Sequence, residues 1–328
     1  MTGSELRQPG TSPDSTGCAA TIAVDDFARA IGVTPDDVPS DLRTLITASD
    51  LRYRLLSQEE RDRVILSIIT RLDANGFSKA GKDRRANWER AWAELAEDSA
   101  RTEYAAEGLV PRYVDANPVV RFQRDYVQPL GPDFEGRFSK VFRTWLFRKY
   151  LASPAAIYEF GCGSGFNLLA LGRLFPDKSL CGLDWADSSV QLVNAIARRH
   201  RLQLTGRSFD FFAPDGSMEL EPGSAVLTMC ALEQIGADHE AFIQFLLARS
   251  PAICVTMEPL YELYEAAHLV DFLAMKYHEQ RGYLRGYLPR LRQLESQGRL
   301  EILRAQRVCF GNLYHEGYSY VVWRPVAA

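Results

Sequence analysis

From residue 155 onward, short apolar segments alternate with helix-like segments, and this alternation restricts the fold more than any other feature. The apolar segments AAIYEF, SAVLTMC and AICVTME are separated by stretches such as SVQLVNAIARRH. A strand, helix, strand order at this spacing predicts a parallel sheet with helices on both faces. The last two apolar segments, LEILRAQRVCF and YSYVVW, are joined only by GNLYHEG, so we expect an antiparallel hairpin at the sheet edge.

The part of the chain before residue 151 has a different pattern. Residues 1–20 are rich in Gly, Ser, Thr and Pro, which predicts a disordered tail. Residues 21–150 have mainly helical periodicity, including a segment that begins at Ser57 as a helix cap. A second segment places Trp88 and Trp92 on one helix face, which we interpret as packing. We therefore predict a tail, a helical lid or substrate domain at 21–150, and an α/β domain at 151–328.

The composition excludes several classes of protein. The chain has 328 residues, a formal net charge of −4 and 46% hydrophobic residues, so no overall basic field exists to hold nucleic acid. No apolar run approaches the roughly 20 residues that a membrane span needs. The six cysteines form no CxxC pair, which predicts free thiols and a cytoplasmic location. No periodic apolar seam specifies a dimer, and a homodimer stays an open alternative.

The strongest motif is a glycine-rich turn directly after the first strand of the α/β part. It reads Glu-Phe-Gly-Cys-Gly-Ser-Gly-Phe-Asn over residues 159–167. Glycines at a strand-to-helix turn let the backbone come close to a ligand and direct amides at it. The third glycine arrives one residue too early for the dinucleotide fingerprint, which argues against a nicotinamide-dependent oxidoreductase.

This segment resembles motif I of class I S-adenosylmethionine-dependent methyltransferases. The resemblance implies a seven-stranded, mostly parallel, doubly wound sheet with an antiparallel C-terminal hairpin, and S-adenosylmethionine as the cofactor. It implies that Asp184 binds the ribose hydroxyls and that Trp185 packs on the adenine. The residues that it assigns to the cofactor are Glu159, Gly161, Cys162, Gly163, Gly165, Asn167, Asp184, Trp185, Asp210, Phe211 and Cys230.

Three clusters of polar residues follow predicted strands and are candidates for acid or base chemistry. Glu233 and Gln234 follow the fourth strand, and Glu258 and Tyr261 follow the fifth. His315 lies in the closing hairpin and could act as a general base. The alternatives are a first-turn acid for Glu233 and a surface turn for His315.

Metal binding and substrate binding are further hypotheses from the same regions. Gln234 and His315 are candidate ligands for a divalent metal, although no metal-spacing motif is present. Arg121, Tyr126 and Tyr318 are candidate substrate contacts, and Arg121 could hold a carboxylate or phosphate.

We therefore expect a methyltransferase that acts on a small polar metabolite, in specialised metabolism or in the tailoring of sugars and natural products. The alternatives are a metal-assisted C- or O-methyltransferase, an RNA methyltransferase and a protein that binds the cofactor without catalysis. For RNA, the segment MKYHEQRGYLRGYLPRLRQ interleaves tyrosines with arginines, but an amphipathic helix that covers the sheet explains the same pattern.

Overall fold

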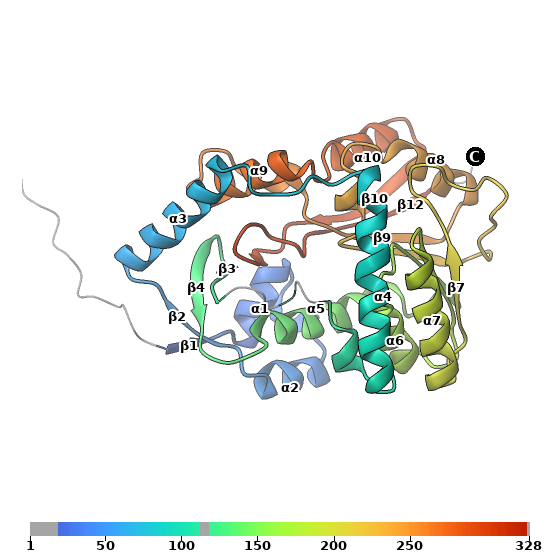
Figure 1. Ribbon diagram of the computed structural model, residues 1–328, viewed down its shortest axis with the longest axis horizontal. Helices are drawn as coiled ribbons and strands as arrows, with labels where there is room; N and C mark the ends of the chain where they lie inside the picture. Colours follow the sequence, from blue (N-terminus) through green and yellow to red (C-terminus); the bar gives the residue numbers. More distant parts are fainter. Residues whose placement is uncertain (1–18, 112–113, 115–117, 327–328) are drawn as a thin grey trace, which may run out of the picture.

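The computed structural model describes residues 19–111, 114 and 118–326, which form two sheets with their covering helices (Figure 1). The predicted tail lies outside the described residues, except that Ala19 and Ala20 begin a strand. No helix among the described residues is both long and apolar enough to cross a membrane.

The larger sheet has seven strands in the order β10-β12-β9-β8-β5-β6-β7. The pairs among β5 to β9 are parallel, and β12 is antiparallel to both of its neighbours. This order and the reversed last strand confirm the predicted sheet and its closing hairpin. The strands are β5 (Ala156–Phe160), β6 (Ser179–Asp184), β7 (Leu204–Ser208), β8 (Ala225–Met229), β9 (Ile253–Met257), β10 (Leu300–Gln306) and β12 (Tyr320–Pro325).

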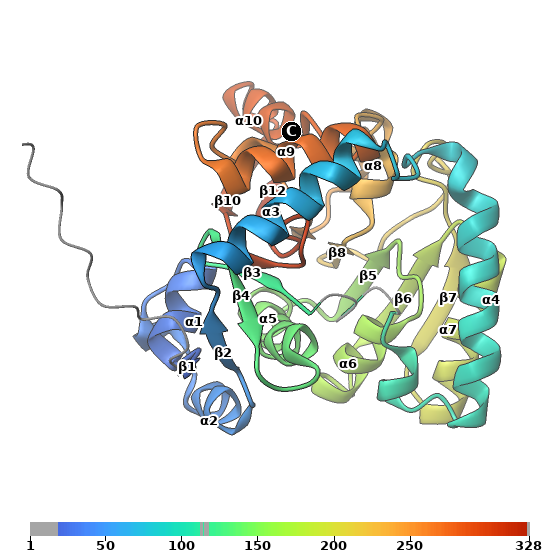
Figure 2. The same cartoon turned by 60° about the vertical axis from the view of Figure 1, so that its left-hand side comes forward.

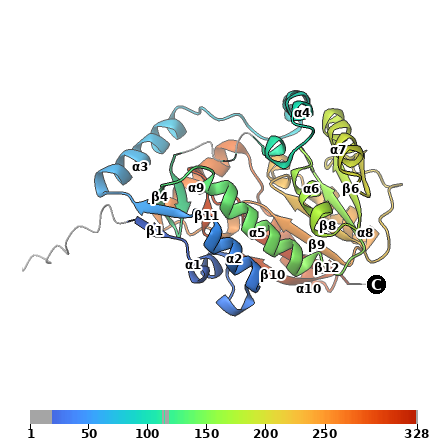
Figure 3. The ribbon, with the colours of Figure 1, turned by 90° about the horizontal axis from the view of Figure 1, so that it is seen from below.

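Helices cover both faces of this sheet, so its central strands are buried on both sides. Along β5, Ile157 belongs to the apolar cluster on one face, and Ala156 and Tyr158 belong to the cluster on the other. Helices α5, α6 and α7 lie on the first face, and α8 and α10 lie on the second (Figure 3). These helices are α5 (Phe134–Tyr150), α6 (Phe166–Leu174), α7 (Asp187–His200), α8 (Glu240–Arg249) and α10 (Tyr287–Ser296).

The region before β5 is not wholly helical, which differs from the sequence-based prediction. It contributes four strands to a small antiparallel sheet in the order β1-β2-β4-β3-β11. Gln123 and Arg124 both have positive φ, at 51° and 68°, and form the tight turn between β3 and β4. The strands are β1 (Ala19–Thr21), β2 (Arg52–Leu55), β3 (Val120–Phe122), β4 (Asp125–Pro129) and β11 (Phe310–Gly311).

The fifth strand of the small sheet, β11, comes from the far end of the chain. Phe310 pairs with Phe122 and Gly311 pairs with Arg121, so the loop between β10 and β12 closes the N-terminal sheet. Phe310 also stacks on Phe138 of α5 at a ring distance of 3.7 Å. The two sheets therefore share one aromatic core.

The remaining helices lie around these sheets. Ser57 caps α3 as predicted, since its hydroxyl accepts from the Glu60 amide at 3.2 Å. Helix α3 runs along α9, and α4 runs beside α7 at the edge of the large sheet (Figures 1 and 2). These α-helices are α1 (Val24–Ile31), α2 (Ser40–Ala48), α3 (Gln58–Asp73), α4 (Arg85–Arg101) and α9 (Leu269–Arg281). The short 3₁₀ helices are η1 (Pro35–Asp37), η2 (Lys82–Arg84), η3 (Ala106–Leu109), η4 (Leu232–Ile235) and η5 (Tyr261–Leu263).

A buried ion network fastens α9 to the closing hairpin. The Arg307 guanidinium lies 2.6 Å from Asp271 of α9 and 2.6 Å from Glu316 of the hairpin loop. The Asp271 and Glu316 side chains are almost fully buried, so both carboxylates need charge compensation. Arg307 provides it for Glu316, and Arg307 and Arg124, the latter at 3.1 Å, provide it for Asp271.

Candidate functional site

The predicted glycine turn lies at the carboxyl end of β5 and opens α6. Gly161, Gly163 and Gly165 all have positive φ, at 72°, 50° and 70°. A Cβ on Gly161 would lie 2.3 Å from Ala231 Cβ, and one on Gly163 would lie 2.7 Å from Trp92 Cζ2. Both the backbone conformation and the available space therefore require glycine at these positions.

Asp184 ends β6 next to this turn. Its Oδ2 accepts from the Gly163 amide at 2.9 Å, and its Oδ1 accepts from the Ala186 amide at 3.0 Å. Burial raises the pKa of this carboxyl to about 6, while the backbone N–H bonds act against that rise. Asp184 also lines the pocket, and a carboxylate there can accept from a ligand with two adjacent hydroxyls.

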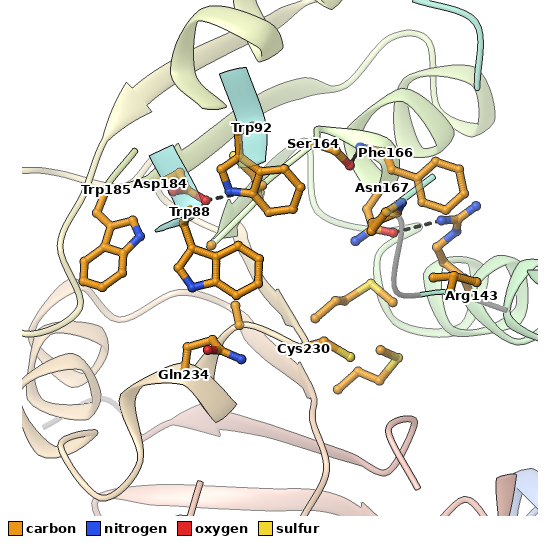
Figure 4. A pocket seen from close by; sticks show the side chains of 18 of the residues that line it. Trp88, Trp92, Arg143, Ser164, Phe166, Asn167, Asp184, Trp185, Cys230 and Gln234 are labelled. Carbon is orange, nitrogen blue, oxygen red and sulfur yellow. Dashed lines mark hydrogen bonds between the residues drawn. The ribbon is translucent and has the colours of Figure 1, made fainter. Parts of the chain in front are cut away.

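A single pocket joins the glycine turn, Asp184 and the ends of β8 and β9. Figure 4 shows Trp88, Trp92 and Trp185 on one side of it, and Arg143 with Asn167 on the other. The described residues that line it are Trp88, Trp92, Pro111, Val114, Ser139, Arg143, Gly161, Cys162, Gly163, Ser164, Phe166, Asn167, Asp184, Trp185, Phe211, Met229, Cys230, Ala231, Gln234, Ile235, Met257 and Tyr318.

The Asn167 side chain is hydrogen-bonded to both a guanidinium and a carboxyl group. The Arg143 Nη1 donates to Asn167 Oδ1 at 3.0 Å, and Asn167 Nδ2 donates to Glu159 Oε1 at 2.7 Å. The other Glu159 oxygen is buried without a hydrogen-bond partner. Burial raises the pKa of Glu159 to about 8 and lowers that of Arg143 to about 10. This group can take a ligand that carries both a carboxylate and an ammonium.

Helix α4 covers the pocket on the side of the tryptophans. Trp88 and Trp92 stack on each other at 5.4 Å, and the Glu89 carboxylate accepts from the Ser188 amide at the start of α7 at 2.9 Å. The sequence interpretation of these tryptophans as packing was therefore incomplete, because both also line the pocket. Their four-residue spacing on one helix face was the signal that the sequence offered, and it does not distinguish packing from a pocket wall.

The predicted cluster after β8 and β9 divides into a pocket residue and its supports. Gln234 lines the pocket and donates to Glu233 Oε1 at 2.9 Å, which leaves the Gln234 oxygen buried without a partner. Glu258 is fully buried, and its carboxylate accepts from the backbone amides of residues 231, 232 and 233 at 3.0 to 3.1 Å. Burial and the nearby Glu233 raise the pKa of Glu258 to about 8. Glu258 thus holds the backbone that presents Gln234.

Other predicted site residues do not line the pocket. The His315 Nδ1 lies 3.2 Å from His278 Nε2 in a buried cluster with tyrosines, and burial lowers the pKa of His315. The Arg121 guanidinium donates to the Val270 carbonyl at 2.8 Å and to the Tyr126 hydroxyl at 3.1 Å, so the buried pair supports the fold.

Two more predicted residues serve local structure. Tyr261 donates to Glu279 Oε1 at 2.9 Å, and Asp210 accepts from the Phe212 amide at 2.9 Å. Among the pair proposed as metal ligands, Gln234 lines the pocket and His315 does not. The described part of the chain contains no group of three or more His, Cys, Asp or Glu side chains that could hold a metal ion.

Four further residues predicted to bind the cofactor line this pocket, namely Cys162, Trp185, Phe211 and Cys230, and so does Tyr318, which was predicted to contact the substrate. Sequence reasoning missed Arg143, because a single arginine on an otherwise packed helix gives no local signal.

No protein-family model matches the sequence, and no curated protein matches it either. Similar solved structures include an O-methyltransferase family 2 protein from Planctomyces limnophilus, at 12% identity and a TM-score of 0.40, covering 57% of this chain and 59% of that chain. The cyclase SpnF is 14% identical with a TM-score of 0.46, covering 76% of this chain and 98% of SpnF.

A dimethyltransferase, RosA from Streptomyces davawensis, is 14% identical with a TM-score of 0.41, covering 93% of this chain and 89% of RosA. The aligned part of this chain spans less than two thirds of the Planctomyces protein. Because these similarities are low, we base the function on the residues of the pocket.

Proposed function

We propose that this protein is an S-adenosylmethionine-dependent methyltransferase that acts on a small molecule. One observation carries the proposal: a single pocket has a glycine turn with a ribose-type acid at one end and an amide and a guanidinium group at the other, and the amide is hydrogen-bonded to the buried Glu159 carboxylate. S-Adenosylmethionine has a nucleoside at one end and an amino acid at the other. It supplies a methyl group that is already activated by the sulfonium.

The residues fit this cofactor by their chemistry. Asp184 would accept from the ribose hydroxyls, and the glycine turn allows close approach of the backbone. Arg143 would take the carboxylate of the methionine part. Glu159, which is held by Asn167, has an unpartnered oxygen that would accept from the ammonium. The chain would then contribute position and exclusion of water, which is most of what such a transfer needs.

Helix α4 supports the proposal that the N-terminal region covers the site, since Trp88 and Trp92 close one side of the pocket. A small acceptor fits such a covered site better than RNA does. The aromatic residues of the proposed RNA segment also serve the core, because Tyr283 and Tyr287 are buried. A metal-assisted route remains an alternative, which EDTA treatment of the active protein would test.

The test is calorimetric titration with S-adenosylhomocysteine, 5′-methylthioadenosine and NADH. We expect Asp184→Ala to weaken the binding of both sulfur nucleosides, because both contain the ribose. We expect Arg143→Leu to weaken the binding of S-adenosylhomocysteine by about tenfold or more. The affinity for 5′-methylthioadenosine should stay nearly unchanged, since only S-adenosylhomocysteine has a carboxylate. Binding of NADH alone would support the oxidoreductase alternative and contradict the proposal.

A further inference from the structure

The half of the pocket beyond the methionine end is mainly apolar. Met229 and Met257 end neighbouring strands there, and Phe166 and Tyr318 complete the same surface. Two polar atoms in the pocket wall are buried without partners, the Trp88 indole nitrogen and the Gln234 amide oxygen. One is a donor and the other is an acceptor, so each can bind a polar substituent on a flat apolar molecule.

Tyr318 is an ionisable group on this side of the pocket, and it is hydrogen-bonded to the carboxylate of Glu135. Its hydroxyl donates to Glu135 Oε1 at 3.0 Å, and both side chains are buried, with 8% and 6% exposed. The rings of Phe138, Phe142 and Phe310 lie 5.6 to 6.3 Å from the Tyr318 ring and fix its orientation.

The location of Tyr318 is set by the sheet. The Cys230 thiol donates to the Gly317 carbonyl at 3.4 Å, and the Glu258 amide donates to the Ser319 carbonyl at 2.8 Å. These contacts hold the segment around Tyr318 against the ends of β8 and β9. The methionine part of the proposed cofactor would lie at these strand ends. Cys230 itself has a φ of 52°, a strained backbone of the kind found at functional sites.

We infer that the acceptor is a hydroxylated aromatic molecule and that its proton passes through Tyr318 to Glu135. This inference rests on the methyl-transfer function proposed above. The acceptor hydroxyl donates to the Tyr318 oxygen while Tyr318 donates to Glu135. The acceptor oxygen forms the new C–O bond, and the C–S bond breaks with its electron pair kept by sulfur. The proton ends on Glu135 and is later lost to water, so the charge of the sulfonium is balanced by the released proton. Tyr318 is therefore the proposed catalytic residue, and Glu135 acts through it as the final proton acceptor.

The test compares two phenolic probes that differ in their need for a base. 2-Naphthol keeps its proton at neutral pH, whereas 4-nitrophenol ionises close to neutral pH. At pH 8, we expect Tyr318→Phe and Glu135→Gln to lower kcat/KM for 2-naphthol by about 100-fold. The same variants should lower kcat/KM for 4-nitrophenol by less than about threefold, because no base is needed. Tyr320→Phe, at a buried tyrosine that does not line the pocket, is the matched control.

Binding of S-adenosylhomocysteine, measured by calorimetry on each variant, separates the two proposals. An equal loss with both probes would show a structural role for Tyr318 and would overturn the relay. Normal nucleoside binding without methylation of either phenol by the unmodified protein would overturn the assignment of the acceptor. Absence of nucleoside binding in the unmodified protein would instead remove the proposed function.

Discussion

Glu159 should release a proton when the cofactor binds, and Glu159→Gln should abolish that release. Burial raises the pKa of Glu159 to about 8, so at pH 7 about nine molecules in ten carry the neutral carboxyl. An ammonium beside the unpartnered oxygen favours the charged form and returns the pKa toward its ordinary range. About 0.9 proton should therefore leave per ligand at pH 7 and about 0.1 at pH 9.

The same linkage sets the pH dependence of affinity. Because the ligand binds the ionised form, affinity should rise by up to about tenfold per pH unit between pH 6 and pH 8, and then level off. Glu159→Gln should remove this slope between pH 7 and pH 8, where Asp184, with a pKa raised to about 6, is already mostly ionised.

The assay is titration calorimetry with S-adenosylhomocysteine in two buffers of different ionisation enthalpy. The observed heats differ by the number of protons exchanged. Any proton exchange by the amino group of the ligand is common to both proteins and cancels in the comparison. Glu240→Gln is the matched control, because the pKa of Glu240 is about 2 beside Arg290 and this carboxylate stays ionised throughout. Equal proton release by the unmodified protein and by Glu159→Gln would refute the reasoning.

Two further changes test the site and the fold. Gly163→Ala should weaken binding of S-adenosylhomocysteine by about tenfold or more, because it strains a φ of 50° and places Cβ 2.7 Å from Trp92. The control is Gly216→Ala, because a Cβ at Gly216 would have no other atom within 4 Å. Calorimetry should show unchanged binding of S-adenosylhomocysteine for this variant. Arg307→Met should cost about 3–5 kcal/mol in urea denaturation, because it removes the ion-pair partner of the buried Glu316 carboxylate and leaves Asp271 with Arg124 alone. Arg324 forms an exposed ion pair with Glu301, so Arg324→Met should lower the free energy of unfolding by less than about 1 kcal/mol. Equal losses of stability in the two variants would contradict this account.

The sequence was sufficient to predict the large sheet and the proximity of the glycine turn to Asp184, since both depend on local patterns. Strand-helix alternation determines the parallel sheet, and the glycine turn and Asp184 lie at the ends of adjacent strands. Trp185 directly follows β6 and Phe211 comes shortly after β7, so both could be named from their positions after predicted strands.

The rest of the site depends on contacts between distant segments, which no local pattern reports. Arg143 reaches Asn167 from a helix before the sheet, and Tyr318 reaches Glu135 across most of the chain. His315 has an ionisable side chain in a suitable loop, but the fold turns it toward His278. The small sheet was missed because its strands are short and because Gln123 and Arg124 are not typical residues for a tight turn.

The pairing of β11 with β3 has a consequence for the order of folding. The small sheet begins with residues made early in synthesis, but its last strand is Phe310–Gly311. Strand pairing over such a sequence separation forms slowly, because a long loop must close before the contact is gained. The N-terminal sheet therefore stays incomplete until almost all of the chain has left the ribosome. Its edge at β3 is open to other chains during that interval.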